Sequence, residues 1–216
     1  MLKLDGIRVT IKGFIILRGI SLEIPSGGLI GLVGRNGAGK TTTLKSIMGI
    51  MPVSAGSIHV DGDDLLKVPG HRRAQLGIGY MPEDRRLIGA LTVEDNILLP
   101  AWASGLKTGS ERLAYIYRLM GDVRELASRR ASQLSGGQQK MVALARALMS
   151  GTKLLLLDEP FEGLAPGLGE KLGQTIQALQ REGLSVLIAE SDQKRISFAR
   201  KIYTIERGEI VQGAGS

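Results

Sequence analysis

The chain has 216 residues, of which 43% are hydrophobic, so it can bury the core of one α/β domain that carries a smaller subdomain. It has no cysteine, which excludes disulfides, thiolate metal sites and cysteine nucleophiles, and no apolar run approaches the roughly 20 residues that span a membrane. The net charge is +7, but the basic residues stand in dispersed pairs and aromatic residues make up 4%, which favours a solvated surface over nucleic-acid binding.

Apolar alternation and β-branched residues predict short strands in the first part of the chain. The expected strands are Leu2–Val9, Leu17–Ile24, Leu29–Val33, Ser57–Val60 and Gly77–Met81. Because the first strand begins at Leu2, we expect no signal segment at the amino terminus. Between the third and fourth strands, Thr41–Ile50 reads as a helix that Gly49 and Pro52 terminate.

Helical spacing replaces strand signals from about Val93 to Met149. The helices expected in this region are Glu111–Met120, Val123–Arg130 and Gln138–Met149. The last of them is rich in alanine and leucine and begins just after two glycines. This region therefore reads as a helical insertion in a chain that is otherwise α/β.

Strand and helix signals alternate again after Met149. The expected elements are strand Lys153–Leu157, helix Gly169–Glu182, strand Ser185–Ala189 and a hairpin of strands Ile202–Ile205 and Glu209–Val211. The first of these strands is a continuous apolar run, which is typical of a parallel strand buried on both faces. We expect the last residues, Gly213–Ser216, to be frayed.

A phosphate-binding loop follows the strand Leu29–Val33 directly. The motif G-x-x-x-x-G-K-[ST] is matched by Gly34, Arg35, Asn36, Gly37, Ala38, Gly39, Lys40 and Thr41. Its glycines let successive backbone N–H groups face an anion, and the following helix adds its positive N-terminal end. In a nucleoside triphosphate site we expect Lys40 to reach the β- and γ-phosphates, Thr41 to ligate Mg²⁺, and Thr42 to line the site beside them.

Two adjacent acids follow the apolar strand Lys153–Leu157. Asp158 and Glu159 stand where this strand reaches the carboxyl edge of the sheet, and ligand sites of open α/β folds form at that edge. Asp158 suits the Mg²⁺ shell, whereas Glu159, which points elsewhere, suits the general base that polarises the attacking water. The alternative is a pair of solvated acids that cap a strand.

A short glycine motif precedes the helix Gln138–Met149. It consists of Leu134, Ser135, Gly136, Gly137 and Gln138. Together with the phosphate loop upstream, it resembles the signature of one class only, the ATP-binding cassette (ABC) ATPases. In that class two subunits pack head to tail, and each signature clamps the γ-phosphate bound to the partner's loop. The resemblance implies a composite ATP site shared by two subunits.

The resemblance also implies the fold. It predicts a P-loop ABC ATPase core of the α/β class, with a mostly parallel sheet, N-terminal antiparallel strands and an inserted helical subdomain. The chain would form a single nucleotide-binding domain over residues 1–216, and residues 84–150 would form the helical subdomain that carries the signature.

Beyond the shared motifs, nearly the whole chain is similar to ATP-binding subunits of branched-chain amino-acid uptake transporters. The similar segments are Asn36–Gly49, His71–Ala74, Ile78–Arg86, Leu91–Asn96 and Glu162–Pro166. This implies ATP and Mg²⁺ as ligands, and a second ABC subunit, identical or paralogous, as partner. It further implies transmembrane permease subunits docked near Asp84–Leu106, a substrate-binding protein, and a cytoplasmic location on the inner face of the cell membrane.

Three positions depart from the pattern of the class. Glu83 stands where most ABC ATPases carry a glutamine that senses Mg²⁺ and water; a carboxylate can ligate a cation but adds negative charge beside the γ-phosphate. Ile11 stands where an aromatic ring usually stacks on adenine, and Phe14 is the nearest aromatic. Ser191 stands in place of a switch histidine, so we expect slow hydrolysis or dependence on a paralogous partner's better site.

The sequence therefore predicts an ATP-hydrolysing subunit of an ABC importer for branched-chain or other amino acids. One alternative is a nucleic-acid-linked ABC ATPase, although such relatives usually carry long coiled-coil insertions or two tandem cassettes. The other is a degenerate regulatory subunit that binds ATP without turnover, an idea motivated by Ser191.

Overall fold

The computed structural model describes residues 1–214, and for Gln212–Ala214 the backbone only. An antiparallel sheet has the strand order β2-β1-β4-β5, with β1 at Leu2–Ile11, β2 at Phe14–Ile24, β4 at Ala55–Val60 and β5 at Asp63–Asp64. A second sheet has the order β10-β9-β3-β8-β7-β6, with β3 at Leu29–Val33, β6 at Ile78–Met81, β7 at Leu154–Asp158, β8 at Ser185–Glu190, β9 at Lys201–Glu206 and β10 at Glu209–Ala214. Neighbours in the second sheet run parallel, except that β9 and β10 form an antiparallel hairpin.

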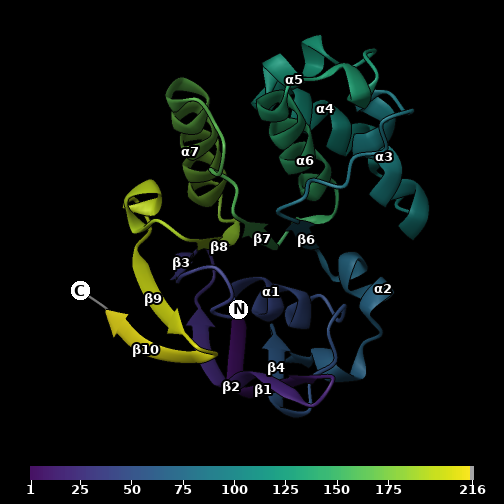
Figure 1. Cartoon of the computed structure of the whole chain (residues 1–216). Coiled ribbons are helices and arrows are strands. Elements are labelled where there is room, and N and C mark those ends of the chain that lie inside the picture. Colours follow the sequence, from purple (N-terminus) through teal and green to yellow (C-terminus); the bar gives the residue numbers. More distant parts are fainter. Residues whose placement is uncertain (215–216) are drawn as a thin grey trace.

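Helices cover both faces of the second sheet. They are α1 (Lys40–Ile47), α2 (Gly70–Arg73), α3 (Val93–Ser104), α4 (Gly109–Leu119), α5 (Gly121–Glu125), α6 (Gly136–Ser150) and α7 (Pro166–Arg181). Helix α1 lies between the two sheets, whereas α3 to α6 form a separate group beyond β6, and α7 stands on that same side (Figure 1). In the described part of the chain, no helix is long and apolar enough to cross a membrane.

The strand β7 shows why the second sheet lies between two layers. Leu154 and Leu156 belong to the apolar cluster around α1 and the antiparallel sheet. Leu155 and Leu157 point the other way, into the cluster formed with α3 to α7. Since side chains alternate between the two faces of a strand, an uninterrupted apolar run is what a sheet covered on both sides requires. The predicted doubly buried strand is confirmed.

Helix α3 lies in the expected helical insertion, in a part of it where no individual helix was located. Thr92 caps its N-terminus by accepting the Asp95 N–H at 3.0 Å, and the Asp95 carboxylate accepts the Thr92 N–H in return. Its buried side chains include Val93, Ile97 and Ala101. The helix expected at Val123–Arg130 is wrong beyond Glu125, because the carbonyls of residues 127 and 129 accept N–H groups of the first turn of α3.

Smaller differences concern the ends of elements. Helix α1 ends at Ile47 rather than Ile50, and α7 begins at Pro166, a residue well suited to a first helical position. Strand β10 extends to Ala214, where it pairs with Ile202, so the fraying expected at Gly213 and Ala214 is wrong. Residues 215–216 lie outside the described part of the chain.

Candidate functional site

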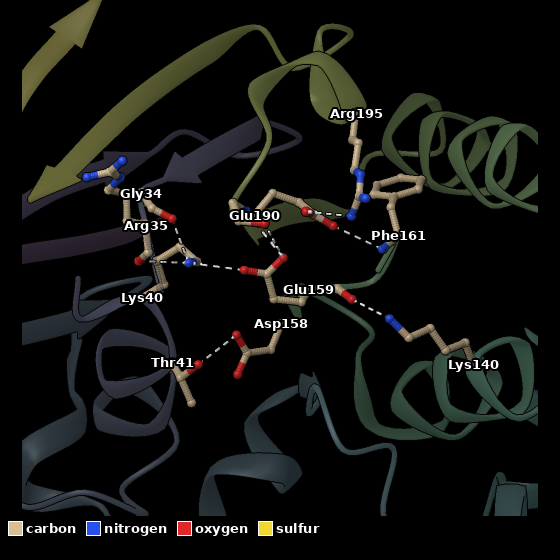
Figure 2. Close-up of polar contacts among 11 residues, drawn as sticks. Gly34, Arg35, Lys40, Thr41, Lys140, Asp158, Glu159, Phe161, Glu190 and Arg195 are labelled. Atoms are coloured by element: carbon tan, nitrogen blue, oxygen red, sulfur yellow. Dashed lines mark hydrogen bonds and ion pairs between the residues drawn. The ribbon is translucent and has the colours of Figure 1, made fainter. Parts of the chain in front are cut away.

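The predicted phosphate loop and carboxylates meet at one edge of the second sheet. Strands β3, β7 and β8 are parallel neighbours and therefore end at the same edge. The polar residues at or just after these ends are Lys40, Thr41, Asp158, Glu159, Glu190 and Ser191. Several of these side chains point toward one another (Figure 2). The parallel order of the strands thus gathers residues that lie far apart in the sequence.

Close backbone contacts hold the phosphate loop. At Gly34 an added Cβ atom would lie 2.3 Å from the carbonyl oxygen of Ile205, so only glycine fits without a shift. Gly39 has a φ of 115°, in the left-handed region, and it precedes α1 directly. The carbonyl of Ala38 accepts the Gly208 N–H at 2.9 Å, which ties the loop to the turn between β9 and β10. These contacts fix the backbone conformation of the loop.

The start of α1 leaves backbone donors for an anion. The Thr43 N–H donates to the Gly39 carbonyl at 2.9 Å, so the N–H groups of residues 40–42 precede the first bond of the helix. Such a helix start, with its positive end of the dipole, is suited to a phosphate group. Arg35, Asn36 and Gly37 are exposed at the rim of the loop.

Lys40 occupies the centre of the site. Its Nζ atom donates to the carbonyls of Gly34 at 2.7 Å and Arg35 at 3.3 Å. It also forms an ion pair with Glu159, whose Oε1 lies 3.0 Å away, and both side chains are buried. A buried ammonium that holds one carboxylate can exchange it for a phosphate oxygen, because both are anionic acceptors.

Asp158 and Thr41 form a second contact between the loop and β7. Thr41 Oγ1 donates to Asp158 Oδ1 at 3.0 Å, and the hydroxyl of Tyr80 on β6 donates to Asp158 Oδ2 at 3.1 Å. Burial raises the pKa of Asp158, so a cation at this position would offset the cost of its buried charge. Hydroxyl and carboxylate oxygens are ligands that Mg²⁺ prefers. The pair therefore fits Mg²⁺.

Glu159 has a backbone conformation that is unusual for a residue other than glycine. Its φ is 46°, in the left-handed region, and its N–H donates to the Ala189 carbonyl at 2.9 Å. Its Oε2 atom accepts from the Ser191 N–H at 3.2 Å and from the Ser191 hydroxyl at 3.3 Å. Burial alone would raise the pKa of Glu159, but contacts with Glu190, Lys40 and Ser191 outweigh it and lower the pKa. Glu159 is thus held as a carboxylate.

Glu190 is a member of this group that the sequence reasoning missed. It is fully buried at the end of β8, and its Oε1 atom accepts the Phe161 N–H at 3.0 Å. Arg195 lies 3.7 Å from its Oε2 atom, an ion-pair distance. Burial first, and then the contact with Glu159, raises the pKa of Glu190 to about 8. The signal was present, since Glu190 directly follows the expected strand Ser185–Ala189, as Asp158 follows the apolar run before it.

The signature residues form the start of α6. The Ser135 hydroxyl accepts the Gln138 N–H at 3.3 Å, and Gln138 Oε1 accepts the Ser135 N–H at 2.9 Å, which is a reciprocal helix cap. A Cβ atom at Gly137 would lie 2.4 Å from a methyl group of Leu168. In the described structure, no hydrogen bond or ion pair joins Leu134–Gln138 to the phosphate loop.

Two predicted site residues make no polar contact with the others. Glu83 is exposed, and no hydrogen bond joins it to Thr41 or Asp158 within residues 1–214. Ile11 is half-buried at the end of β1 and packs on the apolar cluster around α1. A cavity of about 680 Å³, a volume typical of a ligand site, is lined by Gly34–Ala38, Ser191 and the β9–β10 hairpin. Within residues 1–214, no group of three or more His, Cys, Asp or Glu side chains is placed to hold a metal ion.

Residues 17–162 match a protein-family model described as ABC transporter. The high-affinity branched-chain amino acid transport ATP-binding protein BraG of Pseudomonas aeruginosa is 34% identical over 212 residues, which cover 98% of this chain and 91% of BraG. The lipopolysaccharide export system ATP-binding protein LptB of Escherichia coli strain K12 is also 34% identical, over 203 residues that cover 93% of this chain and 84% of LptB.

Solved structures share the fold. The dimeric structure of MJ0796, a bacterial ABC transporter cassette, has a TM-score of 0.89 and 28% identity, and the match covers 100% of this chain and 98% of that one. A dimeric post-hydrolysis state of MJ0796 bound to ADP and Pi has a TM-score of 0.90 and 27% identity, with the same coverage. The matched family region includes the phosphate loop, the signature and both adjacent carboxylates.

Proposed function

Because the chain belongs to the ABC transporter family, as an ATP-binding cassette ATPase, we propose that it is the ATP-hydrolysing subunit of a membrane importer for branched-chain or other amino acids. The predicted family and fold are confirmed by the family match and the structural neighbours. The observation that carries the site assignment is the Lys40–Glu159 ion pair between the phosphate loop and β7. It supports a catalytic carboxylate beside a phosphate-binding ammonium.

The arrangement suggests how this chain's residues act on ATP. The N–H groups of residues 40–42 and the Lys40 ammonium bind the β- and γ-phosphates, and the rest of the predicted loop surrounds them. When Lys40 turns to phosphate, Glu159 loses that partner and is free to accept a proton from water. The Ser191 N–H and hydroxyl keep the Glu159 carboxylate oriented. Ile11 packs against adenine in this proposal.

Thr41 and Asp158 would hold Mg²⁺, and the exposed Glu83 is a further candidate oxygen ligand. The cation would supply charge that stabilises the negative phosphate oxygens. Tyr80 orients Asp158 through its hydroxyl.

The signature is proposed to act on a second subunit. ABC cassettes work as dimers with transmembrane partners, and both MJ0796 structures above are described as dimeric. Ser135, Gly136 and Gly137 cap α6 and form no contact with this chain's own loop in the described structure. They therefore suit the γ-phosphate on a partner's loop. The partner is a second copy or a paralogue.

A groove supports docking of permease subunits. We assign residues 84–150 to a helical subdomain within one domain over residues 1–216. The groove between this subdomain and the core has a volume of about 360 Å³ and is lined by Lys45, Met48, Ile50, Ala74, Ile78, Tyr80, Pro82, Arg86, Pro100, Arg146, Ala147 and Ser150. Ile50 is an exposed apolar side chain, and so is Trp102, two residues after Pro100. Docking at Asp84–Leu106 would place the chain in the cytoplasm, on the inner face of the membrane, with a substrate-binding protein on the opposite face.

A second candidate is a subunit of a lipopolysaccharide exporter, because LptB is as similar to this chain as BraG, at 34% identity. The two candidates are separated by measuring uptake of labelled leucine in cells whose only copy of this protein carries Glu159→Gln. We expect uptake to be lost; retained uptake with lipopolysaccharide held at the inner membrane would favour export.

The ATPase assignment of Glu159 is tested by the same substitution. We expect Glu159→Gln to abolish phosphate release while ATP-dependent dimerisation, followed by size-exclusion chromatography, persists. Glu170→Gln, the same change at an exposed position of α7, is the control. Unchanged turnover in Glu159→Gln would show that Glu159 is not the base. Absence of turnover in the unmodified protein with every partner would favour a regulatory subunit.

The nucleic-acid alternative has its own test. Filter binding of DNA and RNA at several salt concentrations should show weak, non-saturating retention, because the basic residues are dispersed. Tight binding with a steep dependence on salt would overturn the transporter assignment.

A further inference from the structure

The signature helix α6 contacts Glu159 directly through one side chain. Lys140 lies in α6, one turn beyond Gly136, and its Nζ atom donates to the backbone carbonyl of Glu159 at 2.7 Å (Figure 2). The Lys140 side chain is buried, with a relative exposure of 5%. The same Glu159 carbonyl accepts the Glu162 N–H at 3.3 Å. Lys140 therefore fixes the backbone carbonyl of Glu159, the residue whose side chain is the proposed base.

Packing alone does not explain a buried ammonium at this position. A methionine or leucine would fill similar space without the desolvation of a charge. Burial lowers the pKa of Lys140, and the neighbouring acids Glu162, Glu190 and Glu159 act against this effect, whereas Arg85 reinforces it. Within the described residues, the hydrogen bond to Glu159 is the only one that the ammonium makes. The Lys140 ammonium is thus directed at this single carbonyl.

The Glu159 backbone needs such support. A residue with a side chain at a φ of 46° is held there only when its surroundings fix it. Its N–H is fixed by Ala189 on β8 and its carbonyl by Lys140 on α6. The two contacts come from different parts of the molecule, so the Glu159 peptide joins the sheet to the signature helix.

Helix α6 also contacts the loop that carries Glu83, through Gly136 in its first turn and Arg146 further along. Arg85 donates from Nη1 to the Gly136 carbonyl at 3.2 Å, and Arg146 donates from Nη1 to the Arg86 carbonyl at 2.6 Å. Helix α6 is therefore bound both to this loop and to Glu159. A displacement of its N-terminal end shifts Lys140 with it, because a helix moves as a rigid body over one turn.

We infer that Lys140 is a positioning residue for Glu159, which ties the orientation of the base to the signature helix of the same chain. The inference rests on the proposed role of Glu159 in hydrolysis. It implies that a partner's nucleotide, on engaging Ser135–Gly137, changes the geometry of this chain's own Glu159 through Lys140. Lys140 itself touches neither nucleotide nor water in this scheme.

Lys140→Met tests the inference, and Arg112→Met is the matched control. Arg112 is also a half-buried cation that donates to backbone carbonyls at the other end of α6, Leu148 at 2.9 Å and Gly151 at 3.0 Å. We expect Lys140→Met to lower kcat about 10-fold with KM for ATP within about twofold, because binding is intact and the base is misplaced. Lys140→Arg should restore most of the rate, and Arg112→Met should keep it.

Two further measurements separate the possible outcomes. In the Glu159→Gln background, Lys140→Met should leave ATP-driven dimerisation unchanged. Hydrogen exchange should accelerate in peptides that span residues 157–163 in Lys140→Met but not in Arg112→Met. If Lys140→Met lowers kcat and dimerisation equally, or if exchange and kcat stay as in the unmodified protein, the inference is overturned. Lys140→Gln replaces Lys140→Met if the latter does not fold.

The exchange measurement does not depend on hydrolysis. If Glu159→Gln retains turnover, the proposed function of Glu159 is wrong, yet faster exchange at residues 157–163 would still show that Lys140 holds this segment. If Glu159→Gln is inactive and Lys140→Met matches the unmodified protein in rate and exchange, only the inference about Lys140 is wrong.

Discussion

The phosphate loop and the neighbouring carboxylates Asp158, Glu159 and Glu190, here called the carboxylate cluster, are held by different kinds of contact. Backbone geometry holds the loop, through Gly34 against Ile205 and the hydrogen bond between Ala38 and Gly208. Charged side chains from several elements hold the cluster. Backbone contacts therefore fix the loop, whereas the cluster can exchange partners.

The three buried acids of the cluster outnumber the buried ammonium groups beside them. Asp158, Glu159 and Glu190 are all buried, and Lys40 is the buried ammonium within ion-pair distance of Glu159. Burial raises the pKa of Asp158 and of Glu190, and the neighbouring Glu159 adds to both shifts. A bound cation would relieve this imbalance, and a bound triphosphate would compete for Lys40. We therefore expect ligand-dependent change in the cluster and not in the loop.

Lys40→Met breaks the link between the two regions and should have the largest effect. It removes the proposed phosphate contact, so we expect phosphate release to fall at least about 100-fold. It also leaves Glu159 buried without its ammonium, which should lower the free energy of unfolding by about 3 kcal/mol. Phosphate release and urea denaturation measure the two effects.

A double substitution separates charge from packing in this result. In Lys40→Met with Glu159→Gln, no unpaired carboxylate remains at this position, so part of the lost stability should return. Equal stability of the single and double variants would show that the ion pair is not what stabilises the region.

The loop and the fold around it were predictable because their determinants are local. Gly34, Gly39 and Lys40 belong to one short motif of eight consecutive residues. The apolar run before Asp158 by itself indicates a strand buried on both faces. Tyr80, Lys140 and Glu190 were not predicted as site residues. Their approach depends on the strand order β3-β8-β7-β6 and on the packing of α6 against it, which no short motif specifies.

The helical region was less predictable for a similar reason. The alternation of apolar residues does not separate α3 from a loop, and its capping residues Thr92 and Asp95 are a weak signal on their own. The segment 126–131 has helical spacing, yet its carbonyls pair with the start of α3 and with nearby turns instead. Tertiary contacts override local propensity here.

Two glycine substitutions test the rigid backbone of the loop. Gly34→Ala should lower the free energy of unfolding by about 2 to 3 kcal/mol, because its Cβ atom would lie 2.3 Å from a backbone oxygen that cannot rotate away. Gly37→Ala is the matched control. It has a φ of 80° but no atom within 4 Å of the added Cβ, so the cost should be about 1 kcal/mol. Thermal or urea denaturation gives both values, and equal losses would argue against a loop held by close contact.

Glu190→Gln should be recognised by a distinct dependence of stability on pH. The pKa of Glu190 is raised to about 8 in the folded chain, so the folded state keeps a proton that the unfolded state releases near the ordinary carboxyl pKa. The stabilisation is complete below the unfolded pKa and is lost as the pH rises toward 8. The slope approaches about 1.4 kcal/mol per pH unit between the two pKa values.

Glutamine removes this titration but can still occupy the space beside Phe161 and Glu159. Between pH 5 and pH 8 the unfolding free energy of Glu190→Gln should therefore fall less steeply than that of the unmodified protein. Glu170→Gln, which changes an exposed acid on α7, should keep the original slope. Parallel curves for the unmodified protein and Glu190→Gln would mean that Glu190 is ionised in the folded state. The negative charge of the cluster would then be balanced by Lys40 and Arg195 together, without a shared proton.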